Sequence, residues 1–134
     1  MRLVDQLLSH VRVHQLGQLF NVAADLSFGE DELLQPDIFL TSAMAKAPSS
    51  WEAIPLPRLV VEIVSPSSAR TDRIAKRLRY QRAGVTDYWV VDAEQQQVEV
   101  WHPHAETGEI WQERLVWPVP ESAPLIIDLN SIFA

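Results

Sequence analysis

Hydrophobic residues recur along this chain with two spacings, one typical of helices and one typical of strands. Aliphatic residues recur with helical spacing from Leu3 through Val11, which predicts an amphipathic helix in the segment Leu3–Leu16. The same spacing predicts a second helix over Thr71–Ala83. A glycine follows each segment, so we expect Gly17 and Gly84 to cap the two helices at their C-terminal ends.

The second predicted helix has two distinct faces. Asp72, Lys76 and Tyr80 are spaced by four residues, which places them together on one face. A different face is expected to pack on the core, and its members are Ile74, Ala75, Leu78 and Arg82.

Shorter apolar runs bounded by turn residues predict strands, and their order predicts the fold class. A helix between two buried strands favours a crossover connection. The order therefore indicates an α/β (α+β) fold, a mixed β-sheet flanked by helices, in a single domain over residues 1–134. The tail Pro124–Phe133 is expected to pack back as a short helix or strand. The predicted strands are Leu19–Leu26, Gln35–Leu40, Leu59–Val64, Asp87–Val91, Gln97–Trp101 and Ile110–Val116.

The predicted strand Leu59–Val64 carries a glutamate among aliphatic residues. A continuous aliphatic run of this length, bounded by prolines, is typical of a strand buried on both faces. A lone ionised carboxylate there costs several kcal/mol. Glu62 must therefore be neutral, paired with a cation, or placed where the strand meets a cleft or solvent.

Charge is distributed unevenly along the chain. The net charge is -7, which argues against broad, non-specific binding of nucleic acid. Six of the eleven basic residues nevertheless lie between Arg70 and Arg82, directly after the glutamate strand. Such a cluster is either a solvated helix face or a track for phosphate groups.

Three charged residues can meet at one place in this layout. Asp37 begins one predicted strand, Glu62 lies in the next, and Lys76 lies in the helix that follows. Two carboxylates, together with backbone carbonyl oxygens and waters, suit a hard divalent cation such as Mg²⁺ or Mn²⁺. A nearby lysine would stabilise developing negative charge or help to activate a water. Taken singly, Asp37 is equally a turn residue and Lys76 equally part of a surface pair with Asp72.

Several segments in this order resemble the Uma family of putative restriction endonucleases, within the PD-(D/E)XK nuclease superfamily. The resemblance runs from about Leu16 to Trp101 and continues weakly to Phe133. It rests on QPDIFL, on PRLVVEIVSPSS, on the helix residues Asp72, Lys76 and Tyr80, and on AGVTDYWVVDAE.

The resemblance implies a restriction-endonuclease-like core and a Mg²⁺- or Mn²⁺-dependent phosphodiesterase acting on DNA. Asp37 matches the motif aspartate and Glu62 the motif glutamate, so both are expected to bind the metal. Val64 replaces the usual lysine, which makes Lys76 the candidate, as in members whose lysine has moved to the following helix. Asp72 and Tyr80 are further expected members of the site. The arginines expected to contact DNA phosphates are Arg70, Arg73, Arg77 and Arg79.

Two other interpretations stay open. Since the chain begins at what resembles the second helix of family members, we expect it to lack their N-terminal extension, which contributes an acidic residue. The protein would then be a catalytically inactive nuclease fold that binds DNA or another protein. A purely structural interpretation instead pairs Glu62 with Lys76 as a buried ion pair.

The sequence carries weaker indications of location and assembly. The N-terminal segment is interrupted by charged residues, unlike a signal peptide, so a cytoplasmic location is expected. Five tryptophans are present. Trp89 and Trp101 are expected in the core, whereas exposure of Trp51, Trp111 and Trp117 would suggest a homodimer face.

Overall fold

The computed structural model describes residues 2–20, 26–27, 33–34, 36–41, 56–64, 70–120 and 122–133. Within them, a six-stranded mixed sheet has the strand order β1-β4-β5-β6-β7-β8. Two further pairs of strands are β2 with β3 and β9 with β10. The strands are β1 Gln18–Phe20, β2 Leu26–Ser27, β3 Leu33–Leu34, β4 Ile38–Thr41, β5 Leu59–Val64, β6 Asp87–Asp92, β7 Gln97–Trp101, β8 Glu109–Trp111, β9 Arg114–Trp117 and β10 Leu125–Asp128. The helices are α1 Arg2–His14, α2 Arg70–Ala83 and α3 Leu129–Phe133.

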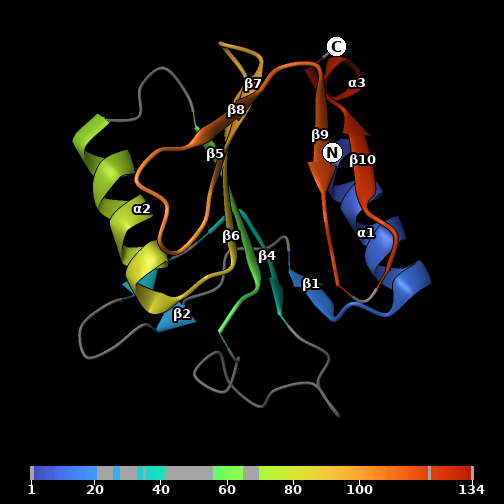
Figure 1. Cartoon of the computed structure of the whole chain (residues 1–134), viewed down its shortest axis with the longest axis horizontal. Coiled ribbons are helices and arrows are strands. Elements are labelled where there is room, and N and C mark those ends of the chain that lie inside the picture. Colours follow the sequence, from blue (N-terminus) through green and yellow to red (C-terminus); the bar gives the residue numbers. More distant parts are fainter. Residues whose placement is uncertain are drawn as a thin grey trace.

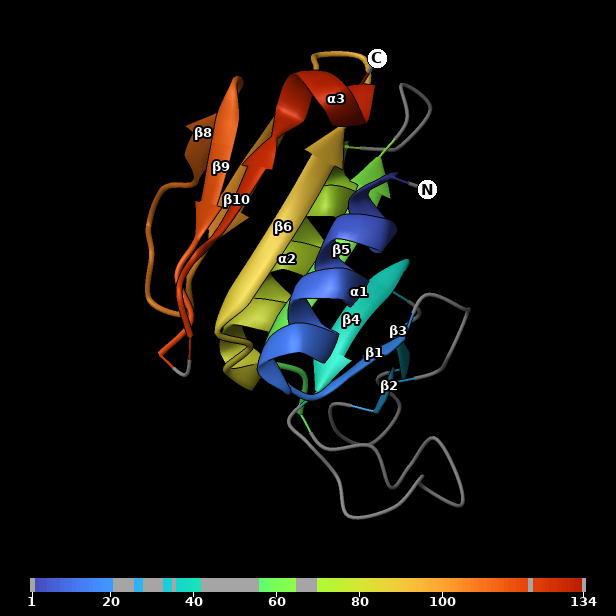
Figure 2. The same cartoon turned by 90° about the vertical axis from the view of Figure 1, so that its right-hand side faces the viewer.

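The large sheet lies between two layers (Figures 1 and 2). Helix α1 and the β9–β10 pair cover one face, and α2 covers the other. β5 and β6 are parallel and joined through α2, while the other neighbours in the sheet are antiparallel. The predicted mixed α/β sheet with flanking helices is therefore confirmed.

Side chains of β5 alternate between the two layers because successive residues of a strand point to opposite faces. Leu59 and Val61 join the core under α1, whereas Val60 and Val64 join the core under α2. Glu62 therefore points toward α2. The strand was expected to be buried on both faces, and the structure agrees, since only Ile63 of its six residues is not fully buried.

The predicted core face of α2 is wrong. Ile74 and Leu78 are exposed over 41% and 42% of their surface, whereas Tyr80 is fully buried. The helix turns Arg73, Lys76, Arg77 and Tyr80 toward the sheet. Because the sheet face below carries the carboxylates of Glu62 and Glu99, it attracts the cationic ends, and their aliphatic stems and the tyrosine ring provide the packing.

The C-terminal ends of α1 and α2 are capped in different ways. Gly84 has φ 91° and caps α2 as predicted, with Val85 N–H donating to the Tyr80 carbonyl at 3.1 Å. The cap predicted at Gly17 is wrong. Gln15 takes the left-handed conformation with φ 53°, and Leu16 N–H donates to the Val11 carbonyl at 3.1 Å. The helix ends at this point because the cap at Gln15 places the Leu16 side chain in the core.

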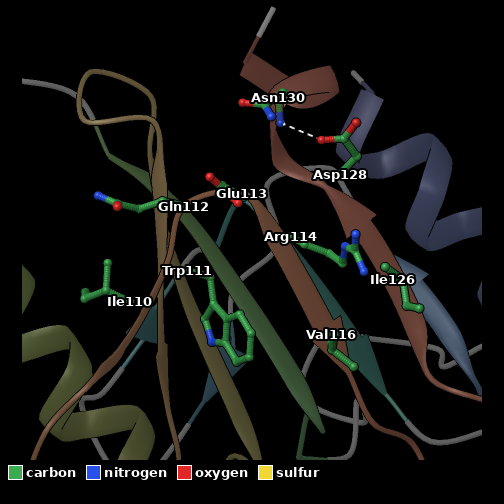
Figure 3. Close-up of a pocket in the computed structure, with 9 residues that line it drawn as sticks. All are labelled: Ile110, Trp111, Gln112, Glu113, Arg114, Val116, Ile126, Asp128 and Asn130. Atoms are coloured by element: carbon green, nitrogen blue, oxygen red, sulfur yellow. Dashed lines mark hydrogen bonds between the residues drawn. The ribbon is translucent and has the colours of Figure 1, made fainter.

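The strand predicted over Ile110–Val116 is instead two strands in different sheets. β8 pairs with β7, and after Gln112 and Glu113 the chain pairs as β9 with β10. A groove of about 960 Å³ opens between β8 and the β9–β10 pair (Figure 3). The tail Pro124–Phe133, expected to be a short helix or strand, forms one of each, the strand β10 and the helix α3.

The tryptophans separate into three groups. Trp89 and Trp101 are buried as predicted, and Trp117, one of the three tryptophans whose exposure would suggest a homodimer face, is also buried. It packs edge-on against Trp89 with ring centroids 5.9 Å apart. Trp111 is half-buried in the groove of Figure 3, and Trp51 lies outside the described residues. The homodimer remains a prediction.

No helix in the described part of the chain has the length and hydropathy needed to cross a membrane.

Candidate functional site

The two predicted carboxylates lie at one end of neighbouring strands. Asp37 directly precedes β4, and its Oδ2 accepts a hydrogen bond of 2.7 Å from the Ile63 backbone N–H in β5. This bond fixes the exposed aspartate beside the C-terminal half of β5. Glu62 is the preceding residue of β5, and its carboxyl is near enough to that of Asp37 for Asp37 to raise the pKa of Glu62. The structure thus brings the two carboxylates together.

Helix α2 covers the two carboxylates and contributes two side chains that face Glu62. Tyr80 donates its hydroxyl to Glu62 Oε1 at 3.1 Å, and both groups are buried. The Lys76 ammonium, one turn earlier on the same face of the helix, is near enough to Glu62 to stabilise its ionised form. Lys76 and Tyr80 therefore face Glu62 as a pair, which the sequence spacing of four residues allows.

Burial dominates the electrostatics of Glu62, which is only 7% exposed. It raises the pKa of the Glu62 carboxyl from 4.5 to about 7. The Lys76 charge and the Tyr80 hydroxyl lower the pKa of Glu62, while the neighbouring Asp37 carboxylate raises it further. Near neutral pH this carboxyl is therefore poised between its neutral and ionised forms.

The pair of carboxylates fits a hard divalent cation. A buried carboxylate beside a second, exposed carboxylate is stabilised by a cation that binds both. Within the described residues there is no group of three or more histidine, aspartate or glutamate side chains that could hold a metal. A cation bound by Asp37 and Glu62 would complete its coordination with backbone oxygen and water, as Mg²⁺ commonly does.

The remaining predicted residues are distributed more widely. Arg73 and Arg77 are half-buried on the side of α2 that faces the sheet, whereas Arg79 is exposed to solvent. The side chains of Arg70 and Asp72 lie outside the described residues. Val64, at the position usual for the lysine, is buried in the core under α2.

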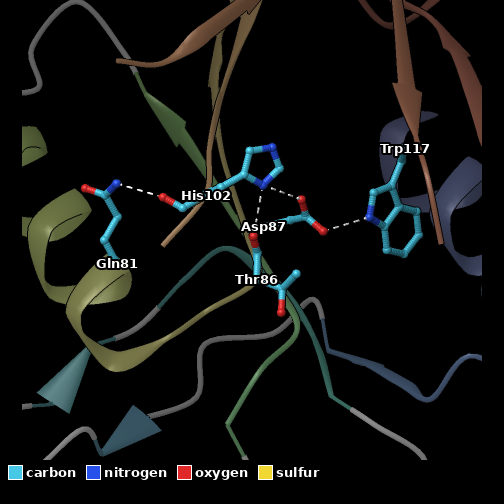
Figure 4. Close-up of polar contacts among 5 residues, drawn as sticks. All are labelled: Gln81, Thr86, Asp87, His102 and Trp117. Carbon is cyan, nitrogen blue, oxygen red and sulfur yellow. Dashed lines mark hydrogen bonds and ion pairs between the residues drawn. The ribbon is translucent and has the colours of Figure 1, made fainter. Parts of the chain in front are cut away.

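Sequence reasoning missed a second polar cluster, at the opposite end of β6 (Figure 4). Asp87 Oδ2 accepts a hydrogen bond of 3.2 Å from Trp117 Nε1. His102 Nδ1 lies 3.3 Å from Asp87 Oδ1 and 3.2 Å from the Thr86 carbonyl. Since Asp87 pairs with Leu59, this cluster ties β9 to the sheet at the start of β5, three residues before Glu62.

Replacing Tyr80 by phenylalanine is expected to raise the pKa of Glu62 further, because the hydroxyl stabilises the ionised carboxylate. Carbon-detected NMR titration of the glutamate carboxyl would measure this change. The loss of a buried hydrogen bond to a group that carries charge should also lower the free energy of unfolding by about 1.5–3 kcal/mol. An unchanged Glu62 titration would show that the hydroxyl does not act on this carboxyl.

Comparison with known proteins places the chain in a family. The family model described as "Uma2: Putative restriction endonuclease" matches residues 1–130. Among solved structures, the chain resembles the crystal structure of a putative nuclease belonging to DUF820 from Anabaena variabilis ATCC 29413. The two are 23% identical, with a TM-score of 0.74 over 98% of this chain and 76% of that chain, a likeness that shows the shared fold. No curated protein matches. The chain therefore belongs to the Uma2 family of putative restriction endonucleases.

Proposed function

We propose that this protein is a metal-dependent endonuclease that hydrolyses phosphodiester bonds in DNA. One observation carries the proposal. A buried glutamate with a raised pKa, an aspartate beside it that is held by the Ile63 N–H, and a lysine on the covering helix lie together at one end of neighbouring strands. Family membership supports the same reaction class.

In this proposal Asp37 and Glu62 hold Mg²⁺ or Mn²⁺. The cation would supply Lewis acidity toward the phosphate and lower the pKa of a bound water. Tyr80 positions the Glu62 carboxylate through its hydroxyl. The charge of Lys76 is placed to stabilise negative charge that develops on the phosphate or to orient the attacking water.

The arginines of α2 supply positive charge for the DNA backbone on an otherwise acidic protein. Arg79 offers an exposed guanidinium, while Arg73 and Arg77 lie closer to the carboxylates, on the sheet side of the helix. Arg70 precedes them at the start of the same helix. Their local charge lets DNA approach despite the net charge of -7.

Calorimetric titration with Mn²⁺ tests the proposed metal site directly. The wild-type protein should bind Mn²⁺ at one site, and Asp37→Asn should weaken that binding by at least about tenfold, because it removes one of two anionic ligands. Asp128→Asn is the matched control, since Asp128 is exposed on β10. Absence of Mn²⁺ binding to the wild type would favour the inactive nuclease fold.

A further inference from the structure

A pocket of about 280 Å³ lies between α2 and the strands β6 and β7. Its volume is close to the lower end of small-molecule sites, which span roughly 300–1,000 Å³. Two arginines, one glutamate and one tryptophan give it a polar and aromatic lining. The lining residues are Arg73, Ile74, Arg77, Val90, Glu99 and Trp101.

The register of the sheet places this pocket next to the carboxylates. Glu62 pairs with Val90, and Val90 pairs with Glu99, so the three residues form one row across the sheet. Paired residues project on the same face, and neighbouring strands are about 4.8 Å apart. Val90 thus lies in the pocket lining one strand away from Glu62, and Glu99 lies one strand further.

Arg77 is held in place before any ligand binds. Its guanidinium lies over the Trp101 ring, 4.0 Å from the centroid, and its Nη1 donates to Gln81 Oε1 at 2.9 Å. Gln81 Nε2 in turn donates to the backbone carbonyls of His102 and Ala105 at 2.8 and 2.9 Å. The pocket therefore contains a pre-positioned planar cation, a surface on which bases stack.

Donor and acceptor groups in the pocket are incompletely used. Arg77 uses one of its five N–H donors on Gln81 Oε1, whereas the Arg73 Nε, which has no partner within the described residues, is shielded from a ligand. The Glu99 carboxylate accepts a hydrogen bond from Trp101 Nε1 and keeps further lone pairs. A ligand that fits must accept hydrogen bonds from a guanidinium and donate hydrogen bonds to a carboxylate.

We propose that this pocket binds an unpaired guanine base of the DNA strand beside the cleavage site, an inference that rests on the proposed function. Guanine presents two adjacent acceptors, O6 and N7, which match arginine. Its N1–H and N2–H groups are two adjacent donors that match a carboxylate. A pocket between a helix and a sheet admits a base only when that base is single-stranded or extruded from the duplex.

Fluorescence anisotropy in EDTA tests this proposal without cleavage. The probes are a labelled oligothymidylate and the same strand carrying one central dG. The wild-type protein should bind the dG strand about tenfold or more tightly. Glu99→Gln, which keeps an acceptor for the Trp101 N–H, should bring the two dissociation constants within about twofold. Glu94→Gln, an exposed change of equal charge, should keep the preference.

Equal binding of the two strands by the wild type, or no binding, would overturn the proposal, as would an unchanged preference in Glu99→Gln. Equal displacement of both strands by inorganic phosphate, without base preference, would identify the pocket as an anion site only. A guanine preference in a protein that never cleaves DNA would refute the proposed nuclease function and would support guanine binding in this pocket. Cleavage without any preference would refute the pocket alone.

Discussion

Replacement of Glu62 by glutamine is expected to abolish metal-dependent DNA cleavage and leave the protein folded. Glutamine keeps the volume of the side chain and an oxygen that accepts the Tyr80 hydroxyl, and it removes the negative charge. Without that charge the Asp37–Glu62 pair loses half of its anionic ligands. We expect a loss of at least about a thousandfold in cleavage rate, comparable with removal of a central electrostatic group in other active sites.

Conversion of supercoiled plasmid to nicked or linear DNA, with Mg²⁺ or Mn²⁺, would measure this loss. Glu62→Ala should abolish cleavage as well, but it also leaves the buried Tyr80 hydroxyl without its acceptor. Its loss of activity would therefore include an effect of lower stability. Glu94→Gln, on the exposed turn after β6, is the control for a change of one charge. Undiminished cleavage by Glu62→Gln would contradict the assignment of this residue to the site.

The metal-free protein should lose stability as the pH rises from about 4.5 to about 7. The folded state raises the pKa of Glu62 above its ordinary 4.5, so in this range the folded protein binds more protons than the unfolded chain. The stabilising contribution of the protonated carboxyl is fully present below pH 4.5, decreases as the pH approaches about 7, and is absent above it. The difference between 4.5 and about 7 corresponds to about 3 kcal/mol in the free energy of unfolding.

Urea denaturation of the wild type and of Glu62→Gln across this pH range would isolate the effect. Burial also raises the pKa of Asp87 and lowers that of His10, and both contributions cancel when the two proteins are compared. The free energy of unfolding of Glu62→Gln should not show the decrease of about 3 kcal/mol that the wild type shows as the pH rises. A parallel pH dependence of the two proteins would show that Glu62 titrates normally.

Added Mn²⁺ should reverse this loss. A cation binds the ionised carboxylates, so the rise in melting temperature that it causes should grow with pH up to about 7 and then level off. A buried ion pair between Glu62 and Lys76 without a metal predicts no such rise. The same titration therefore separates the structural interpretation from the metal site.

The local pattern of the chain predicted much of the fold. The aliphatic run around Glu62 and the helical spacing after it depend on neighbouring residues only, so the parallel β5–α2–β6 unit and the Gly84 cap follow from sequence. The sequence did not predict the break between β8 and β9, because β9 pairs with a strand formed by the distant tail. Burial of Trp117 depends on the same distant pairing.

For the site, the sequence by itself determined that Glu62 needs a partner, since an aliphatic strand cannot hold a lone charge. It also placed Asp37 and Lys76 on the neighbouring elements. Only the tertiary structure decided which face of α2 meets the sheet. Helical periodicity predicts Ile74 and Leu78 inward, but the carboxylates of Glu62 and Glu99 lie on the sheet face below, and the helix turns its cations and Tyr80 toward them. That orientation is what brings Lys76 and Tyr80 to Glu62.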